Sequence, residues 1–177
     1  MRNLNKFSKI FLFICFTSGA LWFGSYFARL TLTYHLFKGN QFQLNDFVNG
    51  QNLPGIISAF NAVILLTSIL YIIFIVSLII FLISSKINLK QNGWLFIISA
   101  IIFITLPFEV YLMTIDYRTI IQVAGGVFNA NEIINLYVKR FKVLSSFPVV
   151  EIICYFAVIF FILFQPFKYK QKEKHED

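Results

Sequence analysis

Residues 55–83 read GIISAFNAVILLTSILYIIFIVSLIIFLI, a predominantly apolar run without a charged side chain. A helix needs about 20 such residues, at ~1.5 Å each, to cross the ~30 Å hydrocarbon core of a bilayer. This run is longer than that, so we expect a helix that tilts or projects beyond the membrane. The segment therefore predicts an integral membrane protein.

Three other segments have the same character. The four expected spans cover about residues 10–29, 55–84, 94–115 and 147–165. The chain is 58% hydrophobic and 13% charged, whereas a soluble domain is about half apolar and a quarter charged. We expect an all-α integral membrane protein, with one four-helix transmembrane bundle over residues 1–170 and a flexible cytoplasmic tail at 171–177.

The first span also has features of a cleaved signal peptide. Basic residues precede it, and Ser18, Gly19 and Ala20 are small. The apolar run is nevertheless long, rich in aromatic residues, and closed by Arg29. We therefore expect it to remain in the protein as a span.

Basic residues near the span ends predict the orientation, because they accumulate on the cytoplasmic side. Nine of the 15 lie on the side of the two termini: Arg2, Lys6, Lys9, Lys86, Lys90, Lys168, Lys170, Lys172 and Lys174. The other six lie on the opposite side: Arg29, Lys38, Arg118, Lys139, Arg140 and Lys142. We expect both termini to be cytoplasmic, in a bacterial inner (cytoplasmic) membrane.

Two outer loops, 30–54 and 116–146, follow from these spans. The first is rich in amides and has turn signals at residues 38–40 and 49–50. The second contains the flexible sequence VAGGVFNANE and then IINLYVKRFKVLSS. Asn131 is a candidate helix cap there, with Glu132 in the first turn.

The IINLYVKRFKVLSS segment has a broad apolar face, which predicts a short outer helix. It lies either at the membrane interface or packed on the bundle. Lys139, Arg140 and Lys142 occupy its polar positions. They form a candidate outer basic patch for anionic headgroups or a partner protein.

Each span carries one polar or charged residue in its outer third: Glu109, Arg29, Glu151 and Asn61. An ionisable side chain inside a membrane is costly and faces protein or water. We expect these residues to form a polar network in which Arg29 pairs with Glu109. Each of the others also has an ordinary role: Glu151 near a helix N-terminus, Asn61 in a helix–helix hydrogen bond, and Arg29 at the interface.

Pro107 predicts a kink just below Glu109, because proline removes one helical hydrogen bond and clashes with the preceding turn. Asp116 lies seven residues after Glu109 and shares its face of the helix. With Arg118 and His35, Asp116 is a candidate rim of a wet crevice. The acidic stripe is alternatively a docking face for Arg29 and Arg118.

Ala20, Gly24 and Ala28 form a stripe of small residues along the first span. Such stripes allow close helix–helix approach in membranes. We interpret this one as packing inside the bundle or against a partner subunit.

The sequence contains no motif typical of a metal site, a nucleophilic enzyme or a nucleotide-binding loop. We therefore expect no catalytic residue, metal ligand or cofactor. The chain carries a net charge of +7, but no basic patch stands free of apolar segments, so nucleic acid is excluded as a partner.

Three functions remain. The first is a small accessory or assembly subunit whose outer loops engage a membrane-protein partner or lipid, without catalysis. The second is an oligomeric channel or transporter that uses a polar crevice around Glu109. The third is an intramembrane acid/base enzyme using Glu109, Glu151 and His35. The expected partners are the lipid bilayer and either another membrane protein or further copies of this chain.

Overall fold

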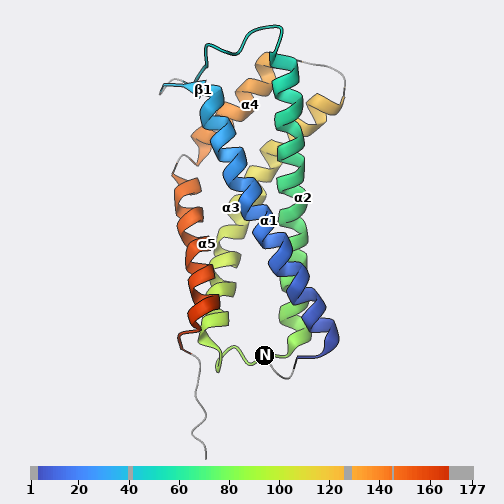
Figure 1. Cartoon of the computed structure of the whole chain (residues 1–177), viewed down its shortest axis with the longest axis vertical. Coiled ribbons are helices and arrows are strands. Elements are labelled where there is room, and N and C mark those ends of the chain that lie inside the picture. The colour runs from blue at the N-terminus through green and yellow to red at the C-terminus, as the bar shows by residue number, and fades with distance from the viewer. Residues whose placement is uncertain (1–3, 40–41, 126–128, 145, 168–177) are drawn as a thin grey trace, which may run out of the picture. The chain divides into compact units, whose positions relative to one another are not determined.

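The computed structural model describes residues 4–39, 42–125, 129–144 and 146–167. The helices of this described part are α1 (Lys6–Leu36), α2 (Leu53–Ser85), α3 (Gly93–Ala124), α4 (Ala130–Val143) and α5 (Phe147–Phe164) (Figure 1). All but α4 are long and apolar enough to cross a membrane. The predicted all-helical class is thus confirmed, and four helices have the length and composition that a membrane span requires. The predicted flexible tail lies outside the described residues.

α1, α2 and α3 are longer than the sequence predicted, whereas α5 agrees with its predicted span to within one residue. α1 continues to Leu36 and α3 to Ala124, into segments expected to be loops. Neither extension contains a glycine or a proline; α1 is followed by the strand Phe37–Lys38, and α3 by Gly125. Helices of 31, 33 and 32 residues measure roughly 46–50 Å at ~1.5 Å per residue, which is more than the ~30 Å that a helix needs to cross the hydrocarbon core.

Contacts divide the chain into two compact units. The first unit comprises Met1–Ser85 and Tyr111–Val143, and therefore contains α1, α2, the last part of α3, and α4. The second comprises Lys86–Val110 and Leu144–Asp177, with the first part of α3 and α5. α3 is assigned as one helix through Pro107, and the division between the units comes three residues later, after Val110. The kink at Pro107 remains a prediction.

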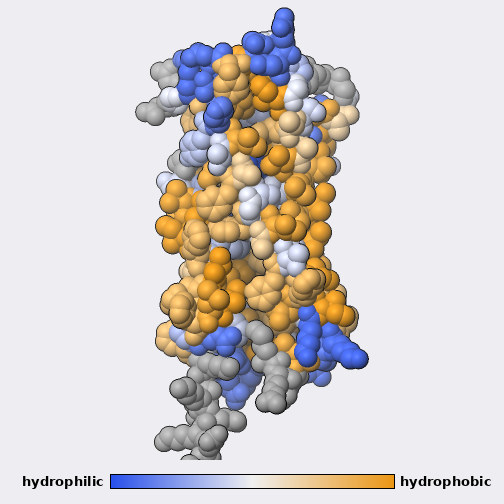
Figure 2. Space-filling model, in the orientation of Figure 1, coloured by the Kyte–Doolittle hydropathy of each residue, from blue (hydrophilic) through white to orange (hydrophobic). Residues whose placement is uncertain are grey.

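α1 and α2 pack closely against each other in the first unit. Trp22 is fully buried, with its ring 5.1 Å from that of Tyr71 and 6.1 Å from that of Phe74. The close approach depends on Gly19, where a Cβ atom would lie 3.0 Å from the Phe74 ring. The visible surface along these helices is mainly hydrophobic, with hydrophilic residues near their ends (Figure 2). This pattern is the one expected of helices in lipid.

A short hairpin follows α1. β1 (Phe37–Lys38) pairs antiparallel with β2 (Gln43–Leu44). Gly39 has a φ of +65°, a conformation that suits glycine, and it coincides with the first predicted turn signal. We define the cap as residues 37–39 and 42–52 together with α4.

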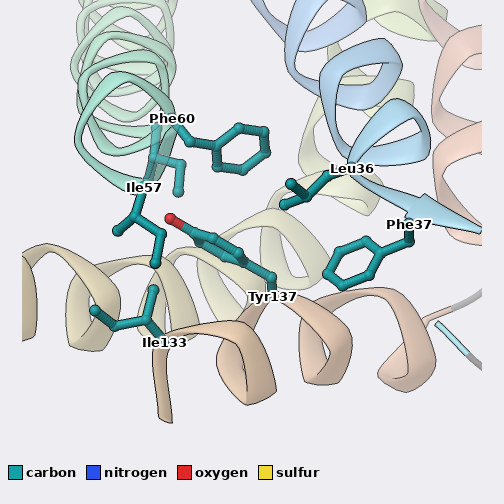
Figure 3. Packing of buried hydrophobic residues seen from close by; sticks show 7 residues of the cluster. Leu36, Phe37, Ile57, Phe60, Ile133 and Tyr137 are labelled. Atoms are coloured by element: carbon teal, nitrogen blue, oxygen red, sulfur yellow. The ribbon is translucent and has the colours of Figure 1, made fainter. Parts of the chain in front are cut away.

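The cap and the ends of α1 and α2 share one hydrophobic core. Ile133 and Tyr137 of α4 point toward Ile57 and Phe60 of α2, with Leu36 beside them (Figure 3). The apolar face of α4 therefore packs on protein, which is one of the two predicted arrangements. Its position relative to the lipid surface remains a prediction.

The cap residue of α4 differs from the predicted one. α4 begins at Ala130, and the Asn129 side-chain oxygen accepts a hydrogen bond from the Glu132 N–H at 3.3 Å. Asn129 thus satisfies a backbone donor in the first turn, as a capping side chain does. Asn131 lies inside the helix because Asn129 supplies the same chemistry two residues earlier.

Candidate functional site

A buried ion network joins three helices of the first unit. The Nη1 of Arg29 (α1) donates to Oδ2 of Asp116 (α3) at 2.8 Å, and its Nη2 donates to Oδ1. Nη1 of Arg140 (α4) lies 3.4 Å from Oδ2 of Asp116, an ion-pair distance without hydrogen-bond geometry. The three side chains are 7%, 3% and 13% exposed. The Asp116 carboxylate thus pairs with two guanidinium groups in a region that is shielded from solvent.

The helical repeat brings Arg29 into this position. The buried face of α1 contains Trp22, Tyr26, Arg29 and Thr33, which recur every three or four residues and so share one side of the helix. Asp116 lies on the buried side of α3 with Leu112 and Thr119. A planar guanidinium and a carboxylate make two parallel hydrogen bonds, which fix both distance and orientation. The pair therefore sets the rotation of α1 against the last part of α3.

Tyr137 connects this network to the hydrophobic core. Its ring lies 4.8 Å from that of Phe60, and the residue is only 3% exposed. Its hydroxyl has no hydrogen-bond partner among the described residues. Burial raises the pKa of Tyr137; the Asp116 charge raises it further, and the Arg29 charge opposes the rise. The phenol therefore stays neutral beside a charged network.

Asparagine side chains hold the loop of the cap in one conformation. The Asn52 amide donates to the Phe47 carbonyl at 2.7 Å, and its oxygen accepts from the Asn49 N–H at 2.8 Å. The Asn45 amide donates to the His35 carbonyl at 3.1 Å, which ties the loop to the end of α1. His35 is exposed, and its ring lies 5.0 Å from that of Phe47. The loop presents Phe47, 44% exposed, on a pre-ordered backbone.

The three residues of the predicted basic patch do not share one surface. Lys139 and Lys142 are exposed on α4, and Nζ of Lys142 lies 5.8 Å above the ring of Phe42. Arg140 instead turns inward to Asp116. The prediction that all three share one outer surface is therefore wrong for Arg140, because the buried carboxylate requires a cation on the inner side of the helix.

The predicted polar network is distributed over both units. Arg29 binds Asp116, which the sequence placed at a crevice rim or on a docking face for Arg29 and Arg118. Asp116 is 2% exposed, so the docking alternative agrees with the structure for Arg29. Arg118 is exposed. Asn61 is half-buried, and its side-chain oxygen has no hydrogen-bond partner among the described residues. Glu109 lies in the second unit, so its pairing with Arg29 remains a prediction.

The second unit contains two buried carboxyl groups. Glu109 on α3 is 3% exposed and Glu151 on α5 is fully buried. α5 begins at Phe147 with Pro148 in its first turn, as predicted. The Phe147 ring lies 5.1 Å from that of Phe108, so the start of α5 lies beside the part of α3 that carries Glu109.

The stripe of small residues on α1 lies away from its contact with α2 in the first unit. Ala20, Gly24 and Ala28 are all exposed, and no atom lies within 4 Å of the position that a Cβ of Gly24 would occupy. The α2 contact uses the Gly19 side of α1 instead. Both predicted roles, packing inside the bundle and packing against a partner, remain predictions.

Within the described residues, no group of three histidine, cysteine, aspartate or glutamate side chains could hold a metal ion. Comparisons with protein-family models, curated proteins and solved structures found no match for this chain.

Proposed function

We propose that this chain is a small multi-pass membrane protein that binds a second membrane protein through its cap, as an accessory or assembly subunit. The main support for this proposal is that the cap is already ordered in the chain by itself. Residues 37–39, 42–52 and α4 share a hydrophobic core with the ends of α1 and α2. A binding surface that is already ordered loses less conformational entropy when its partner docks.

The exposed side chains of the cap suit protein recognition. Phe47 is 44% exposed and Tyr34, at the adjoining end of α1, is 61% exposed. The Tyr34 ring also lies 5.4 Å from that of Phe141 on α4. Aromatic side chains surrounded by polar groups are the usual anchors of protein interfaces. The amide groups of the loop would supply the polar rim.

The proposal includes an orientation. We place both termini in the cytoplasm and the cap, with α4, at the outer surface of a bacterial inner membrane. The nine-to-six division of the 15 basic residues supports this choice. Single cysteines at Gln51 and Lys90, in a chain with Cys15 and Cys154 replaced by serine, test it in intact cells. A membrane-impermeant maleimide should label position 51 only; labelling of position 90 alone would reverse the topology.

Site-specific photo-cross-linking in cells tests the partner. A photoreactive phenylalanine analogue at Phe47 should give a discrete cross-linked species, whereas the same analogue at Ile83, which is 74% exposed at the opposite end of α2, should not. Asn52→Ala, which removes the amide that orders the loop, should abolish the cross-link. Deleting the chain should also lower the amount of the cross-linked protein, as expected for an assembly subunit. Equal cross-linking at both positions would contradict a specific cap interface.

A further inference from the structure

Glu109 places a carboxyl group in an apolar part of α3. It lies 16 residues after Gly93, where α3 begins, which is ~24 Å along the helix axis. Only 3% of the residue is exposed. Within the described residues, its Oε1 atom has no hydrogen-bond donor. A carboxylate in this position lacks the solvation that it has in water.

The polar groups nearest to Glu109 along α3 do not supply a proton. Thr105 lies one turn earlier on the same face and is 4% exposed. Its hydroxyl proton is already donated to the Ile102 carbonyl at 3.1 Å. Pro107 has no N–H, so the Phe103 carbonyl lacks its usual helical donor. This stretch of α3 is therefore richer in hydrogen-bond acceptors than in donors.

An acceptor-rich site in hydrocarbon needs a cation. An unpaired carboxylate is very costly to bury, and membrane-embedded acidic residues commonly serve as sites for protons or ions. We propose that the Glu109 carboxyl group binds a monovalent cation, a proton or a sodium ion, within the membrane. A bound proton would turn one carboxyl oxygen into a donor. It would require no cavity, whereas a sodium ion would require further oxygen ligands.

The second unit also contains Glu151, which is fully buried on α5. This inference is independent of the proposed partner binding at the cap, because it concerns residues of the other unit.

A hydrophobic carbodiimide tests the site directly. Dicyclohexylcarbodiimide reaches protonated carboxyl groups from the lipid; the carboxyl O–H adds across one C=N bond, and the adduct rearranges to a stable N-acylurea. No atom leaves, so the labelled peptide gains the mass of one carbodiimide. We expect the label at Glu109 when the full-length chain is treated in liposomes. A water-soluble carbodiimide with an added amine should instead modify Glu132, which is exposed on α4.

Salt composition distinguishes the two cations. If the site also takes sodium, sodium chloride should slow the labelling of Glu109, and choline chloride at equal ionic strength should not. If neither salt slows it, the site takes protons only. Both results support the proposal. A folded chain in which Glu109 stays unlabelled, with and without sodium, would overturn it and would indicate a carboxylate fixed in an ion pair.

Two variants complete the test. Glu109→Asp should keep the label at position 109, and Glu109→Gln should lose it while the rest of the chain behaves as before. Glu132→Gln, the matched control, should leave labelling at Glu109 unchanged. The primary result is the labelling of Glu109 in the natural chain. A variant that misfolds therefore does not change the conclusion about Glu109. Loss of cap cross-linking with intact Glu109 labelling would contradict the proposed partner binding alone.

Discussion

Arg29 and Asp116 are 87 positions apart in the chain and form a pair of parallel hydrogen bonds inside the first unit. Both side chains are less than one-tenth exposed. Removing two charges from water costs several kcal/mol for each ion, which their attraction repays only when the geometry is good. The bidentate contact meets that condition. The pair therefore contributes more to fixing the relative rotation of α1 and α3 than to net stability.

Asp116→Asn should strongly destabilise the first unit. The substitution leaves the Arg29 and Arg140 guanidinium groups buried without a counter-charge. We expect a loss of about 3–5 kcal/mol in the free energy of unfolding, the usual result of breaking a buried ion pair from one side. Unfolding in mixed micelles with increasing SDS measures it. Asp46→Asn is the matched control, because the Lys38–Asp46 pair is 44% and 84% exposed, and it should change stability by less than ~1 kcal/mol.

Arg140→Gln should loosen α4 without unfolding the rest of the unit. The Arg140–Asp116 ion pair is one contact that ties α4 to α3. Losing an ion pair worth roughly 1 kcal/mol should speed amide hydrogen exchange in α4 about five-fold. Lys139→Gln, on the exposed face of the same helix, should leave exchange unchanged. If the two variants exchange alike, the ion pair does not hold α4.

The spans could be predicted because a run of apolar residues of membrane length has few alternatives. Residues 55–83 need only their composition to predict α2. The ends of the helices were harder to predict from the sequence. Leu30 to His35 include threonine and histidine, which suggest a loop, yet Thr33 bonds to the Arg29 carbonyl at 2.7 Å and continues the helix. A hydroxyl can thus be satisfied by its own helix, which composition alone does not show.

The position of Arg29 along the axis of α1 limits which residues can be its partner. The sequence alone does not identify that partner. Arg29 lies 23 residues after Lys6, and Asp116 lies 23 residues after Gly93, so each is ~34 Å along its helix. Glu109 is ~10 Å lower on α3 by the same rise. Matching these heights would have favoured Asp116. The rotations of the helices, which decide whether the side chains meet, depend on packing between segments distant in sequence.

Tyr137 should make the protein sensitive to alkaline pH. Its pKa is raised in the folded state above the ordinary tyrosine value of about 10, so between the unfolded and folded values the folded state holds one more proton. Stability is then complete below pH ~10 and falls as the pH rises above it. Tyr137→Phe should reduce this loss in SDS titrations at increasing pH. At neutral pH it should cost little, because the hydroxyl has no hydrogen-bond partner among the described residues.

A steeper alkaline loss in Tyr137→Phe than in the natural chain would contradict this assignment. Tyr137→Ala separates the ring from the hydroxyl. It removes the contact with Phe60 and leaves a cavity in the core of the cap. Relative to Tyr137→Phe, we expect it to cost about 3–5 kcal/mol at every pH, as large aromatic truncations do.

Gly19 and Gly24 lie on different sides of α1 and should respond in opposite ways to enlargement. At Gly19 a new Cβ atom would lie 3.0 Å from the Phe74 ring. Gly19→Leu should therefore force α1 and α2 apart and cost ~1–3 kcal/mol, the usual range for overpacking. Gly24→Leu has open space, so SDS titration should show unchanged or slightly higher stability, because glycine is unfavourable within a helix. If Gly24→Leu is folded but its cross-link from Phe47 disappears, the exposed stripe belongs to the partner interface as well. Equal destabilisation by both variants would show that α1 contacts α2 through a different face from the one described.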